Sequence, residues 1–271
     1  MDKKLFEKMD CFFEAISKYS SPAIAFSGGI DSTLLAVAAN KIFPGVPCII
    51  LVSPLLSQTE LSDARQIARE HALNLVEINS DELSQADIIK NDPERCFYCK
   101  KYRFGIISDW AEEHGHDIIF EGSNVDDLSD YRPGMKALQQ APKVCSPLLK
   151  SGFRKSDIRA LANEWRINIW DKPSASCLAT RVDYDVELSV EILTKIEQAE
   201  SIIKKHLPKN ANLRVRTHAE IARIETDTDN FALLVEPDIC KDIVDNIKQL
   251  GFSFVTLDLY GFKSGNMNRN I

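Results

Sequence analysis

The sequence predicts an α/β fold, in which a parallel, doubly wound sheet is followed by a smaller C-terminal α+β domain. Over the first two thirds of the chain, short apolar runs alternate with stretches whose apolar residues recur every three or four positions, a pattern typical of a parallel sheet covered by helices. The run VPCIILV at 46–52 lacks polar alternation, as expected for a strand buried on both faces. From about Tyr184 the pattern changes. We therefore expect two domains, residues 1–182 and residues 183–271.

The elements of the first domain follow from local spacing. Apolar residues recur at three- and four-residue spacing at Leu5, Met9, Phe12, Phe13 and Ile16, which predicts an amphipathic helix over 2–19. The other expected elements are a strand at 22–26, a helix at 31–43, the strand at 46–52, a helix from the capping box of Ser57 and Glu60 to His71, a strand at 73–78, helices at 80–90 and 97–114, a strand at 118–120, a helix at 156–166 with Ser156 as N-cap, and a last strand at 167–170.

The second domain begins with a long helix over 187–206. Residues 213–218 (LRVRTH) alternate between apolar and polar, which predicts a half-buried strand. A second strand at 221–225, a helix at 238–250 and a strand at 252–259 complete the pattern. Strands and helices in this order favour a small α+β domain.

A strand, a glycine turn and a helix start meet at AFSGGIDSTLL, residues 25–35. Glycines allow positive φ and let a ligand approach the bare backbone, while the first amides of a helix lack internal partners. Such a turn binds phosphate. The common GxxxxGK[ST] loop is excluded because its lysine and its longer loop are missing. The alternative is an ordinary strand-to-helix turn, in which Asp31 favours the helix dipole.

The first long polar loop after a buried strand is EGSNVDDLSDYRPG, residues 121–134. It contains three possible metal ligands, Asp126, Asp127 and Asp130. Ligands of open α/β sheets bind at the carboxyl ends of the strands. We therefore expect this loop to lie beside the phosphate-binding turn.

Composition narrows the function classes. The chain has 271 residues, 44% hydrophobic content and a formal net charge of −7, which argues against nonspecific binding to nucleic acid because that needs an extended basic surface. No apolar stretch reaches the roughly 20 residues of a membrane span, and the start MDKKLFEKMD is too polar for a secretion signal. We expect a cytoplasmic protein with no nucleic-acid or membrane partner.

Seven cysteines are an odd number in a chain too large to depend on disulfides, which fits a reducing compartment. Cys96 and Cys99 form a CxxC flanked by basic residues, and two thiolates one turn apart can bind one metal centre. Cys177, in the small-residue segment 172–181, is the expected third partner, because three thiolates suit an iron–sulfur cluster with one open iron. A redox pair, a zinc site and unremarkable thiols are the alternatives. No role is predicted for Cys11, Cys48, Cys145 and Cys240.

Five segments together resemble the LarE family over nearly the whole chain: AFSGGIDS, EGSNVDDLSDYRPG, PSASCLATR, LRVRTHAEIARIE and VTLDLYGFKSGNMN. SGGIDS alone resembles the wider ATP pyrophosphatase (PP-loop) superfamily, whose members cleave ATP between the α and β phosphates. LarE enzymes are ATP-dependent sulfur transferases in the biosynthesis of the nickel-pincer nucleotide cofactor. They adenylylate carboxylates of pyridinium-3,5-biscarboxylic acid mononucleotide and convert them to thiocarboxylates. The resemblance implies a Rossmann-like sheet of the PP-loop type, ATP and Mg²⁺ as cofactors, and a homo-oligomer.

The resemblance also implies roles for residues of the nucleotide site. Asp31 would face the magnesium, and Gly122 would contribute to nucleotide binding. Pyrophosphate would be held by Ser27, Gly28, Gly29 and Ser32.

Substrate would be bound by Arg214, Arg216 and Arg223. Arg214 and Arg216 lie two apart on a strand and so share one face, which suits bidentate recognition of phosphate. The alternative is a solvated sheet face that is balanced by Glu220 and Glu225.

The sulfur chemistry of the family has two versions, both centred on the position of Cys177, with Arg181 as a further catalytic candidate. In one version a lone cysteine gives up its own sulfur and becomes dehydroalanine. In the other a CxxC joins it to hold a [4Fe-4S] cluster, and Cys96 and Cys99 favour this version. The alternatives outside the family are another PP-loop adenylylating enzyme, such as a tRNA thiolase, and a nucleotide-binding regulator with a structural zinc. The sulfide source is left open.

Overall fold

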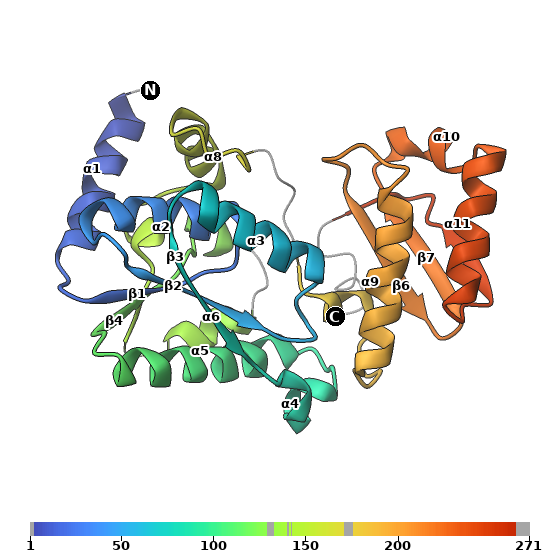
Figure 1. The fold of residues 1–271 in the computed structure, drawn as a ribbon, viewed down its shortest axis with the longest axis horizontal. Coiled ribbons are helices and arrows are strands. Elements are labelled where there is room, and N and C mark those ends of the chain that lie inside the picture. The colour runs from blue at the N-terminus through green and yellow to red at the C-terminus, as the bar shows by residue number, and fades with distance from the viewer. Residues whose placement is uncertain (1–2, 129–132, 140, 142, 171–175, 264–271) are drawn as a thin grey trace. The chain divides into compact units, whose positions relative to one another are not determined.

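The structure is a computed structural model that describes residues 3–128, 133–139, 141, 143–170 and 176–263 (Figure 1). The chain divides into two compact units. The first consists of Met1–Ser53, Gln58–Glu82 and Cys96–Ser174, and the second of Pro54–Ser57, Leu83–Arg95 and Ala175–Ile271. Each unit is therefore built from three separate segments of the chain.

The first unit contains a five-stranded parallel sheet in the order β3-β2-β1-β4-β5. Its strands are β1 Pro22–Ala25, β2 Pro47–Val52, β3 Asn74–Asn79, β4 Ile118–Phe120 and β5 Val144–Cys145. Because β1 pairs with both β2 and β4, the strand order reverses between β1 and β4. In open α/β sheets, ligands bind at the carboxyl ends of the strands beside such a reversal. The predicted parallel, doubly wound sheet is confirmed.

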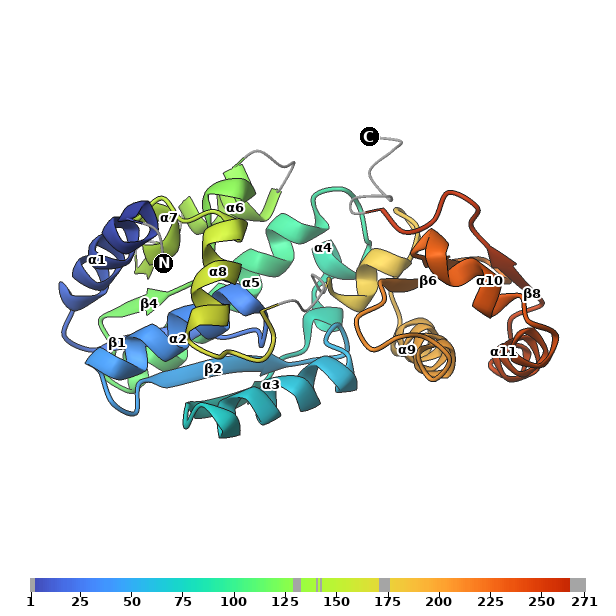
Figure 2. The same cartoon turned by 90° about the horizontal axis from the view of Figure 1, so that it is seen from above.

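Helices cover both faces of this sheet, with α2 and α3 on one side and α5 on the other (Figure 1). Helix α1 packs on α7, and α8 packs on α2 (Figure 2). Connections of this kind bury both faces of a parallel sheet. The helical segments are α1 Lys3–Ser17, α2 Ile30–Ile42, α3 Gln58–Glu70, the 3₁₀ turn η1 Glu82–Ser84, α5 Arg95–Glu113, the 3₁₀ turn η2 Val125–Leu128, α6 Pro133–Gln139, α7 Pro147–Lys150 and α8 Lys155–Glu164.

The central strands supply the apolar core of the first unit. Ile107 and Ala111 of α5 pack against one face of the sheet, where they meet a set of strand residues with alternate spacing: Ala23, Ile49, Leu51 and Ile119. Five of the six residues of β2 are buried, as expected for a strand covered on both faces.

The second unit contains a three-stranded sheet in the order β6-β7-β8. Strand β6 (Leu213–His218) pairs antiparallel with β7 (Ile221–Thr226), and β8 (Phe254–Leu257) pairs parallel with β7. This mixed sheet confirms the predicted α+β pattern. The helical segments of the unit are α4 Ala86–Ile89, the 3₁₀ turn η3 Leu178–Arg181, α9 Val190–Lys204, the 3₁₀ turn η4 Thr228–Asn230, α10 Phe231–Leu234 and α11 Pro237–Gln249.

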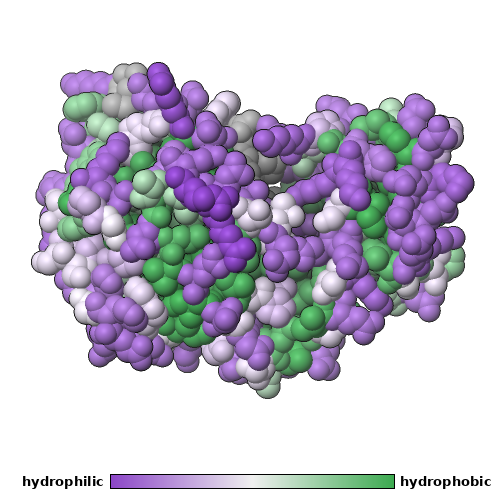
Figure 3. All heavy atoms as spheres, in the orientation of Figure 1, coloured by the Kyte–Doolittle hydropathy of each residue, from purple (hydrophilic) through white to green (hydrophobic). Residues whose placement is uncertain are grey.

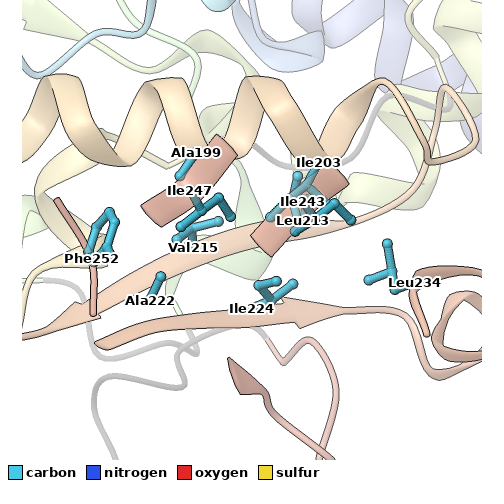
Figure 4. Close-up of a cluster of buried hydrophobic side chains, with 10 residues drawn as sticks. All are labelled: Ala199, Ile203, Leu213, Val215, Ala222, Ile224, Leu234, Ile243, Ile247 and Phe252. Atoms are coloured by element: carbon cyan, nitrogen blue, oxygen red, sulfur yellow. The ribbon is translucent and has the colours of Figure 1, made fainter. Parts of the chain in front are cut away.

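Helices α9 and α11 pack on one face of this sheet and form an apolar core with it (Figure 4). The core consists of Ala199, Ile203, Leu213, Val215, Ala222, Ile224, Leu234, Ile243, Ile247 and Phe252. Side chains alternate across a strand. Since Leu213 and Val215 face the helices, Arg214 and Arg216 lie on the opposite face.

The strand expected at 167–170 is wrong. Arg166 ends α8 with a left-handed φ of +57°, and the amide of Ile167 donates to the Ala162 carbonyl at 2.8 Å. Ile167 is fully buried. A left-handed residue followed by a buried apolar residue is a common end of a helix, so the apolar character of Ile167 arises from capping. The fifth strand is β5 instead, and its two residues are too few to show a period.

Two helix predictions also need correction. The single helix expected at 80–90 is a 3₁₀ turn, η1, followed by the short helix α4. Helix α8 begins at Lys155, and Ser156 is not its N-cap, because Arg154 occupies that position. The Asp157 carboxylate accepts the Arg154 amide at 2.8 Å and thereby satisfies a donor at the helix start.

Hydrophilic residues predominate on the molecular face shown in Figure 3, and hydrophobic residues gather there in smaller patches. Among the helices that the structure describes, none combines the length and the apolar character needed to cross a membrane.

Candidate nucleotide and sulfur site

The turn after β1 is shaped by Gly28, whose φ is +70°. A Cβ atom at this position would lie 2.7 Å from the Cβ of Ala64 on α3. Both the left-handed backbone and the close contact therefore require glycine. As a result, α3 packs directly on the bare backbone of the predicted phosphate-binding turn.

Hydroxyl groups close this turn from within. The Oγ atoms of Ser27 and Ser32 are 3.0 Å apart, and the Ser27 amide donates to Ser32 Oγ at 3.2 Å. The Gly29 amide donates to Ser27 Oγ at 3.3 Å, and α2 begins at the next residue. The structure thus brings all four predicted pyrophosphate-binding residues into one turn at a helix N-terminus, which favours bound anions.

Asp31 lies in the first turn of α2, and its two carboxylate oxygens differ in their contacts with the described residues. Its Oδ2 accepts hydrogen bonds from Lys155 Nζ and from Asn124 Nδ2, the latter at 3.4 Å. Its Oδ1 is buried, and no hydrogen-bond partner for it is found among the described residues. Burial raises the pKa of Asp31 above its ordinary value, and the ammonium group of Lys155 opposes this rise without cancelling it.

The surroundings of Asp31 fit the Mg²⁺ that the resemblance implies. An unpaired buried carboxylate oxygen is costly unless a ligand completes it, and carboxylates are preferred Mg²⁺ ligands. The buried Asp127 contributes a second negative charge, which also raises the pKa of Asp31. Asp31 is therefore the residue that would hold the metal.

The loop after β4 meets α2 at Gly122. A Cβ atom there would lie 3.0 Å from the Ser32 nitrogen, so glycine lets the end of β4 approach the start of α2. Asp126 accepts the Lys155 amide at 2.8 Å and Arg154 Nη1 at 2.8 Å, and it thereby anchors the start of α8. Asp130 lies outside the described residues.

Two residues of this site were missed by sequence reasoning. Asn124 is fully buried, and its Oδ1 accepts the Asp126 amide at 3.0 Å. The loop motif that contains Asn124 was a signal for it. No local pattern marks Lys155, because it reaches Asp31 from 124 positions away in the sequence.

The three candidate cluster ligands divide between the two units. Cys96 and Cys99 lie one turn apart in the first part of α5 and belong to the first unit, whereas Cys177 belongs to the second. Cys177 is exposed and directly precedes η3. None of the seven cysteines forms a disulfide. Within the described residues, no group of three or more His, Cys, Asp or Glu side chains is arranged to hold a metal ion.

Arg181 is 4% exposed, and its guanidinium group is engaged on both sides. Its Nε and Nη2 atoms donate to the Glu200 carboxylate at 2.9 and 3.2 Å. Its Nη1 donates to the carbonyl oxygens of Ser176 at 2.6 Å and Cys177 at 3.0 Å. Arg181 therefore contacts the backbone that carries the Cys177 thiol.

The predicted substrate-binding arginines lie on the sheet face away from α9 and α11. Arg216 Nε donates to the fully buried Glu225 carboxylate at 2.8 Å, and Arg223 Nη2 lies 3.2 Å from the same oxygen. Arg223 Nη1 also donates to Asp258 at 2.9 Å. Arg214 lies over the Phe262 ring, 5.3 Å from its centroid. Two of the three arginines are thus balanced by acidic side chains within the sheet.

Glu220 was expected, in the alternative interpretation, to balance the charge of the arginines, but its described contact is with another group. Its carboxylate accepts the Ser253 hydroxyl at 2.7 Å, and no described contact joins it to an arginine. On the neighbouring strand, His218 Nδ1 pairs with Asp183 at 2.5 Å.

No family model matches the chain, but proteins of similar length do. It is 36% identical over 241 residues to an uncharacterized protein of Methanocaldococcus jannaschii, covering 89% of this chain and 90% of the relative. It is 34% identical over 247 residues to an uncharacterized protein of Synechocystis, covering 91% of each. It is also 33% identical over 258 residues to the pyridinium-3,5-bisthiocarboxylic acid mononucleotide synthase of Lactiplantibacillus plantarum, covering 94% of this chain and 91% of the relative.

The chain belongs to the LarE family. The alignment with the L. plantarum synthase spans both structural units, so membership covers the phosphate-binding turn and the Cys177 turn together. Membership of the LarE family indicates an enzyme with a nucleotide substrate and ATP-dependent chemistry.

Proposed function

We propose that this protein is an ATP-dependent sulfur transferase of nickel-pincer nucleotide biosynthesis. It adenylylates a carboxylate of pyridinium-3,5-biscarboxylic acid mononucleotide and converts it to a thiocarboxylate. The observation that carries the proposal is the buried Oδ1 of Asp31, which has no hydrogen-bond partner among the described residues and lies beside a glycine turn at the reversal of a parallel sheet. That arrangement fits a magnesium-bound pyrophosphate.

Adenylylation overcomes the low reactivity of a carboxylate, because AMP is a far better leaving group than oxide. The turn of Ser27, Gly28 and Gly29 binds the departing pyrophosphate through backbone amides and hydroxyls, which stabilises charge as it develops. Asp31 would hold Mg²⁺, which would supply positive charge next to the phosphates. Lys155, whose ammonium contacts Asp31, adds a second positive charge for a phosphate oxygen.

The sulfur chemistry is assigned to Cys177 by the resemblance to the family, and the exposure of this residue, beside two buried ones, is compatible with that role. A sulfur nucleophile attacks an acyl-adenylate near neutral pH with little assistance. Cys96, Cys99 and Cys177 are the proposed ligands of a [4Fe-4S] cluster, which would supply the sulfide for the transfer. Two thiols one helical turn apart, neither in a disulfide, are a suitable donor set.

Substrate phosphate and carboxylates are assigned to the arginine-bearing face of the second sheet. Arg214 is the first candidate because it is half-buried and its side chain lies over an aromatic ring. Arg223 is the next, since its guanidinium is partly exposed. Arg216 is the weakest of the three candidates, because it is buried and its donors are used within the protein. The homo-oligomer stays a prediction.

The test is turnover by protein purified without oxygen, with ATP, Mg²⁺, a sulfide source and the biscarboxylic mononucleotide. We expect AMP, pyrophosphate and thiocarboxylate in excess over enzyme, with about four irons per chain. Cys96→Ala should lose iron and multiple turnover, whereas the matched control Cys240→Ala, on α11, should keep both. Absence of substrate-dependent AMP formation by the wild-type protein contradicts the proposal.

A second mechanism is sacrificial donation of the Cys177 sulfur. It is favoured by the exposure of Cys177. It predicts one thiocarboxylate per chain and a Cys177 peptide that is lighter by the mass of one hydrogen sulfide. Mass spectrometry after the reaction separates the two mechanisms, because the cluster-dependent one leaves Cys177 unchanged.

A further inference from the structure

Three buried arginines converge on the turn that carries Cys177. Arg95, Arg181 and Arg216 are 3%, 4% and 4% exposed. They come from the first residue of α5, the last residue of η3 and the middle of β6, and all three belong to the second unit. Burying a guanidinium is costly unless its charge and its donors are used. Their donors therefore show what the three residues do.

The donors point at the backbone carbonyls around Cys177. Arg181 Nη1 donates to the carbonyls of Ser176 and Cys177 at 2.6 and 3.0 Å. Arg95 Nη1 donates to the Ala179 carbonyl at 3.1 Å. Arg216 Nη1 donates to the Thr180 carbonyl at 2.5 Å. Four of the five carbonyls from residue 176 to residue 180 thus accept from an arginine. We call the three guanidinium groups the arginine cradle.

Each guanidinium also donates to a side chain from another part of the second unit. Glu200 on α9 takes two donors of Arg181, and Glu225 on β7 takes Nε of Arg216. Arg95 donates to the side-chain oxygen of Asn91. Charge-assisted bonds of this kind are roughly twice as strong as neutral ones, so the cradle ties the turn to the framework of the second unit.

The backbone of the turn is hydrogen-bonded, whereas Cys177 itself is exposed. Cys177 has φ −62° and ψ 154° and caps η3, and the Leu178 amide donates to the Leu55 carbonyl at 3.0 Å. Leu178 and Ala179 are buried, whereas Cys177 is exposed. A reacting group whose main chain is fixed loses little freedom when it attacks, and this fixation contributes to rate.

We infer that Arg95, Arg181 and Arg216 are positioning residues that fix the Cys177 turn for sulfur transfer. The inference rests on the proposed function for the role of Cys177. It gives Arg181 a positioning task in place of a catalytic one. It also gives Arg216 a task within the protein, since its Nε and one Nη are already used.

The first test is local and independent of activity. Arg181→Lys keeps a positive charge for Glu200 but cannot make the bidentate pair and the two carbonyl bonds together. We expect amide hydrogen exchange in peptides covering residues 176–182 to rise about tenfold, since loss of a charge-assisted bond is worth roughly that factor. The rate at which iodoacetamide alkylates Cys177 should change together with this exchange rate. Exchange in α9 and β6 should stay as in the wild type.

The matched control is Arg65→Lys, which makes the same change in a bidentate pair with Glu77 on the surface of the first unit. It should leave exchange at 176–182 unchanged. Unchanged exchange in Arg181→Lys, or a uniform rise across the whole second unit, overturns the cradle.

The second test divides the reaction into its two steps. Arg181→Lys should form AMP and pyrophosphate from ATP and the biscarboxylic mononucleotide with KM for ATP unchanged, while thiocarboxylate formation falls about tenfold. Arg95→Lys should act in the same direction with a smaller loss, because it removes one carbonyl bond. An equal fall in both steps overturns the inference. If the wild-type protein makes no thiocarboxylate, the proposed function fails, and the exchange measurement still decides the cradle.

Discussion

The phosphate-binding turn and the Cys177 turn are held in opposite ways. The first closes on itself, because hydroxyls and amides between Ser27 and Ser32 bond to one another within six residues. The second is held from outside by guanidinium groups that come from α5 and β6. The residues that close the first turn all lie within one short motif, so the turn can be predicted from that motif. The second turn depends on side chains that are distant in the sequence, so its local sequence predicts it only in part.

The strongest predicted consequence of the way the Cys177 turn is held concerns the reactivity of its thiol. Burial raises the pKa of Cys48 to about 12, so at pH 8 only about one such thiol in ten thousand is ionised. Cys177 is exposed, and we expect iodoacetamide to modify it at least about a hundredfold faster than Cys48. Peptide mass spectrometry over a time course measures both rates. Equal rates would mean that the Cys177 turn does not present its thiol to solvent.

Next in size is the loss of the Asp31 carboxylate. Asp31→Asn should lower substrate-dependent pyrophosphate formation by about a hundredfold or more, because the ligand for the metal is lost. Its midpoint of thermal unfolding should not fall, since a buried charge is removed. The companion variant Asp245→Asn changes a surface pair with Lys241 on α11 and should keep most activity. Full activity of Asp31→Asn would show that this turn does not bind the metal.

Packing at the self-closing turn gives a smaller effect. Gly28→Ala should lower the free energy of unfolding by about 3 kcal/mol, because it combines a left-handed backbone with an overpacked contact at Ala64. Gly45 has φ +81°, but a Cβ atom there would meet no other atom within 4 Å, so Gly45→Ala should cost only about 1 kcal/mol. Urea unfolding of both variants measures the difference. Equal costs would show that α3 does not press on the turn.

The smallest effect is a pH dependence in metal-free buffer. The folded-state pKa of Asp31 is raised by burial, so its charge destabilises the fold above that pKa, and the penalty disappears as pH falls below the unfolded value of about 3.9. Asp31→Asn should therefore be more stable than the wild type near neutral pH, and the difference should shrink on acidification. A difference that grows on acidification would mean that the pKa is lowered instead.

Sequence reasoning was sufficient where signals are local. Strands β1, β2 and β4, the glycine turn, and β6 with β7 all lie within about two residues of their predicted positions. It failed where the role of a residue depends on a partner that is distant in the sequence. Ile167 was predicted to lie in a strand, although its backbone amide caps the end of α8, and β5 could not be predicted because it has only two residues.

The candidate site follows the same division. Ser27, Gly28 and Asp31 could be found from a hexapeptide, whereas Lys155 is 124 positions from Asp31. The tasks of Arg95 and Arg216 were also invisible, because a basic side chain gives no sign of whether it will bind solvent, substrate or a carbonyl oxygen. Such assignments depend on tertiary contacts.

The division of the second unit into three segments has a consequence for synthesis of the chain. Pro54–Ser57 and Leu83–Arg95 leave the ribosome long before Ala175–Ile271. Leu55 and Asn91 must therefore wait for Leu178 and Asp183, on the order of ten seconds at ordinary translation rates. The hydrogen bonds within residues 27–32 have no such delay, because their partners emerge together, whereas the contact of Asp31 with Lys155 must wait. A nascent chain of this protein would thus close the predicted phosphate-binding turn first, and the early segments of its second unit are the ones a chaperone would need to shield.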